Sequence, residues 1–192
     1  CLVWQMVKMT LLSNINLKAC PFLVRMLQSG EDLEALLKLP PEKLLMRWVN
    51  YHLEQAGHKK RITNFGPDLK DSDVYCTLLK QIDPERLATT TILSNSDLLA
   101  RAAYVVQQGG RLQSEFHIQP LDIVKANEKL NLGFLAALFN ASPGLDPPVE
   151  EELKLMAELP EEEDAGDSRE ERAFRMWLNS LGIETYVNNL YD

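Results

Sequence analysis

The sequence predicts an all-α protein, and three observations support this prediction. Apolar residues recur three and four positions apart in several stretches, as they do along the buried face of a helix. Proline, glycine and an Asp-Pro pair follow these stretches, where helices usually stop. No stretch alternates convincingly between polar and apolar residues; the best strand candidate, residues 89–93, is short and flanked by loop residues. The 192 residues, 45% hydrophobic and 25% charged, have a globular composition rather than a disordered one.

The central part of the chain predicts four helices and one short turn. We expect helices over about 41–56, 70–82, 97–108 and 128–140, with the turn at 120–125. The first begins at Pro41, carries Trp48 on its apolar face and ends at Gly57. For the helix over about 70–82, the expected start signal is Asp68 or Asp71. For the helix over about 97–108, we expect a cap at Asn95 or Ser96 and a stop at Gly109-Gly110.

Two segments precede this region. Residues 2–12 are apolar around most of a helical circumference, so we expect this helix to pack against another surface. No sequence upstream supplies that surface, and the chain starts at Cys1 rather than at a methionine, so we interpret it as a fragment. Residues 13–40 predict a connector with helical content that ends at Leu39-Pro40-Pro41.

The net charge of −8 is concentrated near the C-terminal end. Residues 146–171 carry two basic and twelve acidic side chains, and residues 143–171 hold four of the ten prolines. This composition predicts a solvated linker. A further helix is expected over 168–181, where Ser168 and Glu171 fit a capping box and Gly182 is the stop. Its Met176-Trp177-Leu178-Asn179 echoes Arg47-Trp48-Val49-Asn50 about 129 residues earlier, which suggests tandem domains whose first helices are anchored by a core tryptophan.

Motifs of catalysis and metal binding are absent from the sequence. There is no phosphate-binding loop, HExxH, GxSxG or EF-hand pattern, and no apolar run reaches the roughly 18 residues of a membrane span. Three cysteines without a CxxC pair argue against disulfides and zinc and favour a reducing, cytosolic setting. We therefore expect no enzyme activity, no metal and no cofactor. Individual side chains have structural explanations: a hydrogen-bonded core histidine for His52, a buried thiol for Cys76, capping for Asp71 and Asp73, and core positions for Trp4, Trp48 and Trp177.

Several segments, in order and spacing, resemble one known family. The residues that carry the resemblance are 41–53 (Pro-Glu-Lys-Leu-Leu-Met-Arg-Trp-Val-Asn-Tyr-His-Leu), 62–65, 68–75, 78–84, 129–140 and 169–182. They resemble the plastin/fimbrin group of actin-bundling proteins, which are built from tandem calponin-homology domains. The likeness covers nearly the whole chain except the acidic linker and residues 85–118.

The resemblance implies a domain layout. Residues 1–12 would be the last helix of an upstream calponin-homology domain, 13–40 a helical connector and 41–141 a complete calponin-homology domain. Residues 142–171 would be the acidic, proline-containing linker, and 172–192 the first helix of a following domain.

The implied function is binding and crosslinking of actin filaments, without enzyme activity. The implied partners are actin filaments and neighbouring calponin-homology domains of the same chain. We expect a monomeric, cytoplasmic protein of the actin cytoskeleton that binds neither nucleic acid nor membranes. The alternative is a helical adaptor or regulatory domain that binds a different protein or packs only within its own chain, because this fold hosts both roles. No EF-hand supports calcium regulation, and without the body of the first domain the fragment should bind actin weakly at best.

By the same resemblance, the surfaces that contact actin are carried over to segments 2–12 and 42–56. On the first segment, Gln5, Lys8 and Met9 are the candidates. On the second, Lys43, Arg47, Asn50 and Glu54 form a polar stripe at helical spacing. Lys8, Lys43 and Arg47 would favour approach to an acidic filament. The basic run after this helix allows two interpretations, a solvated loop or a contact for an acidic partner, and its candidate residues are Lys59, Lys60 and Arg61.

Overall fold

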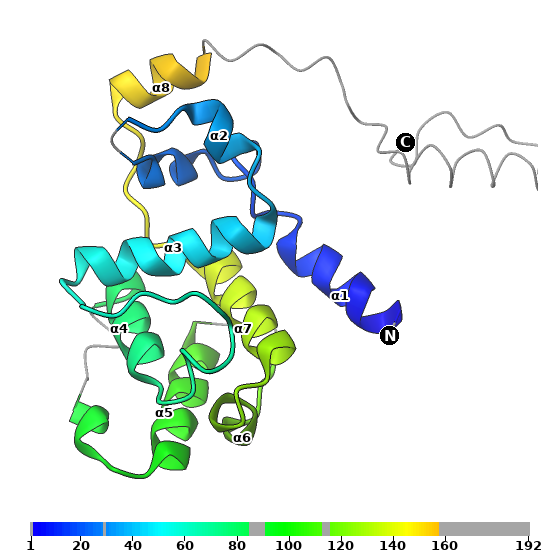
Figure 1. Ribbon diagram of the computed structural model, residues 1–192, viewed down its shortest axis with the longest axis vertical. Helices are drawn as coiled ribbons and strands as arrows, with labels where there is room; N and C mark the ends of the chain where they lie inside the picture. The colour runs from blue at the N-terminus through cyan, green and yellow to red at the C-terminus, as the bar shows by residue number, and fades with distance from the viewer. Residues whose placement is uncertain (1, 29, 85–90, 113–115, 158–192) are drawn as a thin grey trace, which may run out of the picture. The chain divides into compact units, whose positions relative to one another are not determined.

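The computed structural model describes residues 2–28, 30–84, 91–112 and 116–157, and within these ranges it contains helices and no strand (Figure 1). The all-α prediction is confirmed. The elements in chain order are α1 (Leu2–Leu12), η1 (Pro21–Met26), α2 (Leu33–Leu37), α3 (Pro41–Gln55), α4 (Asp73–Ile82), η2 (Thr91–Ser94), α5 (Leu98–Arg111), α6 (Pro120–Val124), α7 (Glu128–Ala141) and α8 (Glu150–Ala157), where η marks a 3₁₀ helix. None of these helices combines the length and apolarity needed to cross a membrane.

The core forms where α3, α4, α5 and α7 meet. In Figure 1, α3 crosses above α4 and α7, and α2 and α8 lie on its other side. The indole of Trp48 is fully buried and makes edge-on ring contacts with His52 and Phe139. Tyr75 and Phe134 form a second aromatic pair in the same core. The predicted core position of Trp48 is therefore confirmed, and its large apolar surface is a main source of stability.

Gly109 of α5 lies against an aromatic ring of α7, and this contact overturns one sequence prediction. Gly109 and Gly110 were expected to stop the helix, but α5 continues to Arg111. Gly109 is buried, and a Cβ placed on it would lie 2.5 Å from the Cζ atom of Phe134. A side chain at this position would therefore clash with the ring of Phe134. A rule that treats glycine as a helix stop cannot detect such a packing requirement. Gly110 has open space around it.

One further expectation about local structure was wrong, and a weak strand candidate proved not to be a strand where the structure describes it. Asp97, rather than Asn95 or Ser96, caps α5 by accepting a hydrogen bond from the backbone nitrogen of Leu99 at 2.9 Å. Residues 91–94 form the 3₁₀ helix η2 where the strand candidate was placed, and the rest of that candidate lies outside the described residues. The expected stop of α3 is confirmed, because Gly57 follows it with φ +67°, a conformation that glycine adopts without strain.

The chain leaving α7 is fixed to the buried side of α3. The carbonyl oxygen of Pro143 accepts hydrogen bonds from Trp48 Nε1 at 2.7 Å and from His52 Nε2 at 2.9 Å. His52 is therefore the hydrogen-bonded structural histidine that the sequence predicted. Gly144 follows with φ +60° and lies against Ile82 and His52. The contact joins residues 95 positions apart and closes the domain.

Helix α8 lies within residues 142–171, for which we predicted a linker, and it packs near the connector. Glu152 receives a hydrogen bond from the backbone nitrogen of Val149 at 2.9 Å, and it pairs with Arg25 of η1 at 3.2 Å. The segments before and after the central domain therefore meet on the same side of α3 (Figure 1). Residues 158–171, the predicted helix at 168–181 with Trp177, and residues 172–192 lie outside the described residues.

Candidate functional site

A groove runs along the outer side of α3 and contains five of the sequence-predicted candidates. Its volume is about 840 Å³, and its other wall is formed by residues 25–28 and Leu39 of the connector. The candidates that line it are Lys43, Arg47, Asn50, Glu54 and Arg61. The predicted stripe on the first domain helix therefore does face one continuous depression. Met46 and Tyr51 also line it; sequence reasoning assigned them no role, although their helical spacing places them beside the stripe.

Arg47 does not offer a free charge to this groove. Its Nη1 and Nη2 atoms donate to the two carboxylate oxygens of Glu31 at 2.7 and 2.8 Å. Each side chain of the pair is 20% exposed. The hydrogen bonds from Arg47 are the main cause of a pKa of Glu31 below its usual value. The charge of Arg47 is thus neutralised inside the chain, by a residue whose role no local sequence pattern indicates.

Asn50 is also engaged within the chain. Its Nδ2 atom donates to the carbonyl oxygen of Ile62 at 3.0 Å, and its Oδ1 atom accepts from the backbone nitrogen of Ile62 at 2.8 Å. The amide therefore holds the loop that follows α3. Lys43 and Glu54, by contrast, are exposed and form no ion pair with any residue that the structure describes. Lys43 is thus the cation of the predicted stripe that is exposed and has no ion partner among the described residues.

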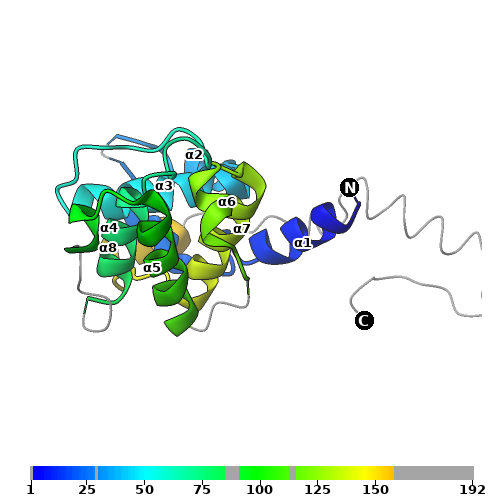
Figure 2. The ribbon, with the colours of Figure 1, turned by 90° about the horizontal axis from the view of Figure 1, so that it is seen from below.

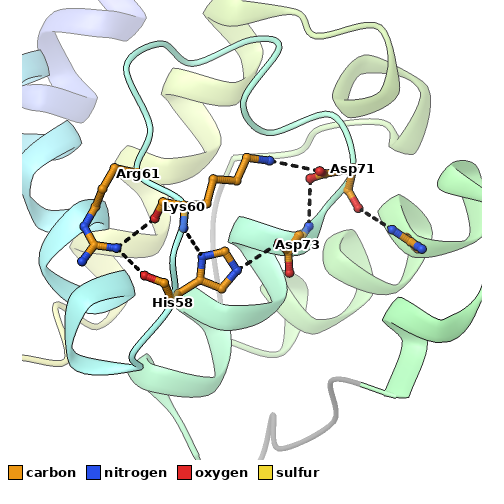
Figure 3. Close-up of polar contacts among 6 residues, drawn as sticks. His58, Lys60, Arg61, Asp71 and Asp73 are labelled. Atoms are coloured by element: carbon orange, nitrogen blue, oxygen red, sulfur yellow. Dashed lines mark hydrogen bonds and ion pairs between the residues drawn. The ribbon is translucent and has the colours of Figure 1, made fainter.

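The basic run after α3 is tied to the start of α4 (Figure 3). His58 Nε2 lies 2.9 Å from Asp73 Oδ2, and Lys60 Nζ lies 3.0 Å from Asp71 Oδ2. Asp71 Oδ1 also accepts from the backbone nitrogen of Asp73 at 3.2 Å. The N-cap residue of α4 is nevertheless Ser72, whose side chain makes no capping hydrogen bond, so the expectation that Asp68 or Asp71 caps this helix was wrong. The pairs formed by His58 and Lys60 give most of the run a structural role.

Two side chains of the same run remain partly available. Arg61 Nη1 donates to the carbonyl oxygens of His58 and Lys60, while the side chain also lines the groove. Lys59 is exposed and forms no ion pair among the residues that the structure covers. Of the two interpretations of the basic run, the solvated loop fits Lys59, which is exposed. It does not fit His58 and Lys60, whose side chains are paired with Asp73 and Asp71.

The candidates on α1 do not line the groove. Gln5 and Met9 are exposed, and Lys8 forms an ion pair with Glu42 of α3. Burial opposes ionisation of Glu42, but the hydrogen bond and charge of Lys8, together with a backbone hydrogen bond, outweigh it and lower its pKa. Trp4 is only half-buried, so the expectation of a core position for it was wrong in this structure.

Most of the apolar surface of α1 lies open, and both views place the helix to one side of the others (Figures 1 and 2). Leu12 is its buried residue. The exposed large apolar side chains of the helix are Leu2, Val3, Met6, Val7 and Met9. A polar contact fixes its end to α7, because Asn140 Nδ2 donates to the carbonyl oxygen of Leu11 at 3.0 Å. An apolar helix surface of this kind is typical of one that packs against another partner.

Burial favours the neutral forms of His52, Cys76 and Cys20. Burial raises the pKa of the Cys76 thiol to about 12 and also raises that of Cys20. Burial lowers the pKa of His52, partly opposed by its hydrogen bond to Pro143. Protonated thiols are poor nucleophiles and poor metal ligands. Within the described ranges, no group of three His, Cys, Asp or Glu side chains is placed to hold a metal ion.

Comparison with known proteins finds relatives that match this chain along its whole length. A family model described as the calponin homology (CH) domain matches residues 39–144. Fimbrin of Saccharomyces cerevisiae is 44% identical over 191 residues, covering all of this chain and 29% of its own length. Fimbrin of Dictyostelium discoideum is 44% identical over 192 residues, and plastin-1 of Mus musculus 43% over 199; this chain covers 30% of each.

The fold has a counterpart among solved structures. A crystal structure of the actin-crosslinking core of Schizosaccharomyces pombe fimbrin matches with a TM-score of 0.62 and 34% sequence identity, over all of this chain and 34% of that one. The chain thus spans about a third or less of the length of the proteins it matches. The resemblance to fimbrins and plastins is confirmed along the whole sequence, and the chain belongs to the calponin homology domain family.

Proposed function

We propose that this chain is part of a fimbrin-like protein that binds and crosslinks actin filaments and has no enzyme activity. The observation that carries the proposal is the similarity over 100% of the chain to fimbrins, including the actin-crosslinking core of Schizosaccharomyces pombe fimbrin. The filaments are those of the cytoplasmic actin cytoskeleton.

The proposed domain layout follows the same relatives. Residues 1–12 end an upstream calponin-homology domain, 13–40 connect it to the domain at 41–141, 142–171 are the linker and 172–192 begin a third domain. The open apolar surface of α1 supports this layout, because Leu2, Val3 and Met6 need a cover that the described residues do not supply. In the intact protein, the body of the upstream domain would be that cover, and the chain would act as a monomer without nucleic-acid or membrane ligands.

Within the candidate set, we assign the strongest electrostatic contact with the filament to Lys43. It is exposed, unpaired among the described residues and located on the groove of α3. Glu54, Gln5, Met9 and Lys59 are exposed and can contribute contact surface. Exposed charges mainly guide association and add modest affinity, so the contribution of each is small.

One observation favours the alternative, a domain that packs within its own chain or serves as an adaptor. Two of the three cations expected to face actin, Lys8 and Arg47, already pair with Glu42 and Glu31. A surface whose charges are satisfied internally needs no acidic partner. The two functions make opposite predictions about filament binding.

Cosedimentation of the intact protein with actin filaments tests the proposal. High-speed pelleting measures binding, and low-speed pelleting measures bundles. Lys43→Glu should weaken filament affinity by about two- to fivefold, because it replaces a modest attraction with a modest repulsion at an exposed position. Lys80→Glu is the matched control, because Lys80 is an exposed residue of α4 that does not line the groove. A protein that stays in the supernatant and forms no bundles would establish the adaptor function instead.

A further inference from the structure

The pairing of Arg47 with Glu31 has the geometry that an arginine uses to bind a carboxylate on a partner. Two guanidinium nitrogens meet two carboxylate oxygens at 2.7 and 2.8 Å, the fork-to-fork arrangement that gives arginine its selectivity for carboxylates. We propose that Glu31 is an in-chain competitor: it occupies Arg47 until a carboxylate of the filament displaces it. This inference rests on the proposed function, because it names how the same groove is regulated.

The carboxylate of Glu31 is presented by a short surface turn. The backbone nitrogen of Glu31 donates to the carbonyl oxygen of Gln28 at 3.0 Å, and the backbone nitrogen of Gln28 donates to Glu31 Oε2 at 3.2 Å. Gly30 takes φ +82° inside the turn, and a Cβ atom added to it would have no neighbouring atom within 4 Å. A side chain at Gly30 would therefore meet no atom of the described residues, so this position of the turn lies open.

The turn is anchored at both ends by buried side chains. Met26 before it and Leu33 after it are buried, so they fix the two ends of the segment. Gln28 and Gly30 between them are exposed. A loop of this kind can open locally at low cost, because few buried contacts are lost.

Release of Arg47 would change the charge that the groove presents. Lys43 lies one helical turn before Arg47 and has no ion partner among the described residues. With Glu31 displaced, two cations at i and i+4 would face the groove together, with Arg61 on the same surface. Among the residues that the structure describes, Glu54 is the one acidic side chain that lines the groove. The exposed site would thus match a carboxylate-bearing segment of the filament.

The competition can be measured with filament cosedimentation of the intact protein. Glu31→Gln keeps the size of the side chain but removes the charge that holds Arg47, so filament affinity should rise about two- to fivefold. Arg47→Gln alone should change affinity less than twofold, because in the parent protein the pair gained with the filament is offset by the loss of the pair with Glu31. The double variant should lose the gain, because the gain acts through Arg47.

Glu34→Gln is the matched control. It also removes one negative charge, from an exposed residue of α2 that pairs with Lys38 rather than with the groove. Its affinity should rise clearly less than that of Glu31→Gln. Thermal unfolding of both variants, followed by circular dichroism, establishes that the helices remain intact. The gain from Glu31→Gln should also shrink as salt is raised, since it comes from an exposed charge.

Three results would overturn the inference while filament binding stands. An equal gain from Glu34→Gln would show a general effect of net charge. A gain that persists in the Arg47→Gln background would show that Arg47 is not the released group. A loss of affinity in Glu31→Gln would show that the pair supports the binding surface. If the parent and every variant stay in the supernatant, the proposed function fails, and the inference fails with it.

Discussion

Helices α1 and α3 were both expected to contact actin, yet they differ in how far their apolar side chains are buried. Helix α3 buries its apolar side chains, with Trp48 and Leu45 at 0% exposure, and leaves its polar stripe on a groove. Helix α1 is more apolar but leaves Leu2 at 77% and Met9 at 71% exposure. The apolar content of a helix thus does not show whether the helix is buried within its own domain.

The difference lies in what surrounds each helix. α3 is packed by α4 and α7 and closed by the carbonyl of Pro143, so its apolar face has partners within residues 39–144 of the family match. α1 contacts α7 and reaches α3 through Lys8 and Glu42. Stability should therefore be concentrated on the buried side of α3, and little of it should depend on α1. Three predictions test this contrast, from the largest effect to the smallest.

Substitution of Trp48 and substitution of Trp4 should have very different effects on stability. Trp48→Ala should lower the free energy of unfolding by about 3–5 kcal/mol, because it opens a cavity and removes the hydrogen bond to Pro143. Trp4→Ala, the matched variant on α1, should cost about 1 kcal/mol or less. Chemical denaturation followed by circular dichroism measures both. Equal losses would show that α1 contributes as much to the stability of the domain as α3.

The buried side of α3 should also make stability depend on pH. Burial lowers the pKa of His52 in the folded state, so the unfolded chain binds a proton first as pH falls. The contribution of neutral His52 is therefore present above its ordinary pKa of about 6.5 and is lost as pH falls through the depressed folded value. Each unit of depression corresponds to about 1.4 kcal/mol.

Denaturation at pH 7.5 and 5.5 measures this effect. The parent should lose more stability between the two values than His52→Gln, whose amide stays neutral at both. The same loss in both proteins would assign the pH dependence to other groups. Helix α1 contains no histidine, so its contacts should not contribute to the change in stability between pH 7.5 and 5.5.

The smallest effect is expected at the contact between the two helices. Lys8→Gln should lower the free energy of unfolding by about 0.2–1 kcal/mol, because the pair with Glu42 is partly exposed. The loss should fade as salt is raised. A double-mutant cycle with Glu42→Gln measures the coupling. A coupling that is unchanged in high salt would indicate a packing contact rather than an ionic one.

Much of the fold could be predicted from spacing and end signals. The predicted central helices correspond to α3, α4, α5 and α7, because apolar spacing reports which face each helix buries. The wrong stop at Gly109-Gly110 has a different origin. A glycine that ends a helix and one that admits a neighbouring ring look alike in sequence, and only Phe134 distinguishes them. That ring lies 25 residues away, beyond the reach of any local rule.

The candidate site could be placed from sequence, but its charges could not. Helical spacing put Lys43, Arg47, Asn50 and Glu54 on one side of α3, and all four line the groove. Which of them is available depends on tertiary partners. Glu31 reaches Arg47 only because the connector folds back along α3, and no periodic pattern describes the path of such a loop. The position of a charge was therefore predictable, while its neutralisation was not.

The shared carbonyl of Pro143 has a consequence for how the protein is made. Trp48 and His52 leave the ribosome long before their acceptor, which is synthesised 95 residues after Trp48. At a synthesis rate of about 5–20 residues per second, the acceptor appears roughly 5–20 s after Trp48. During this time, burial of the two donors would cost free energy, because neither has its hydrogen-bond acceptor. Closure of the domain is thereby coupled to completion of the segment that leads into the rest of the chain.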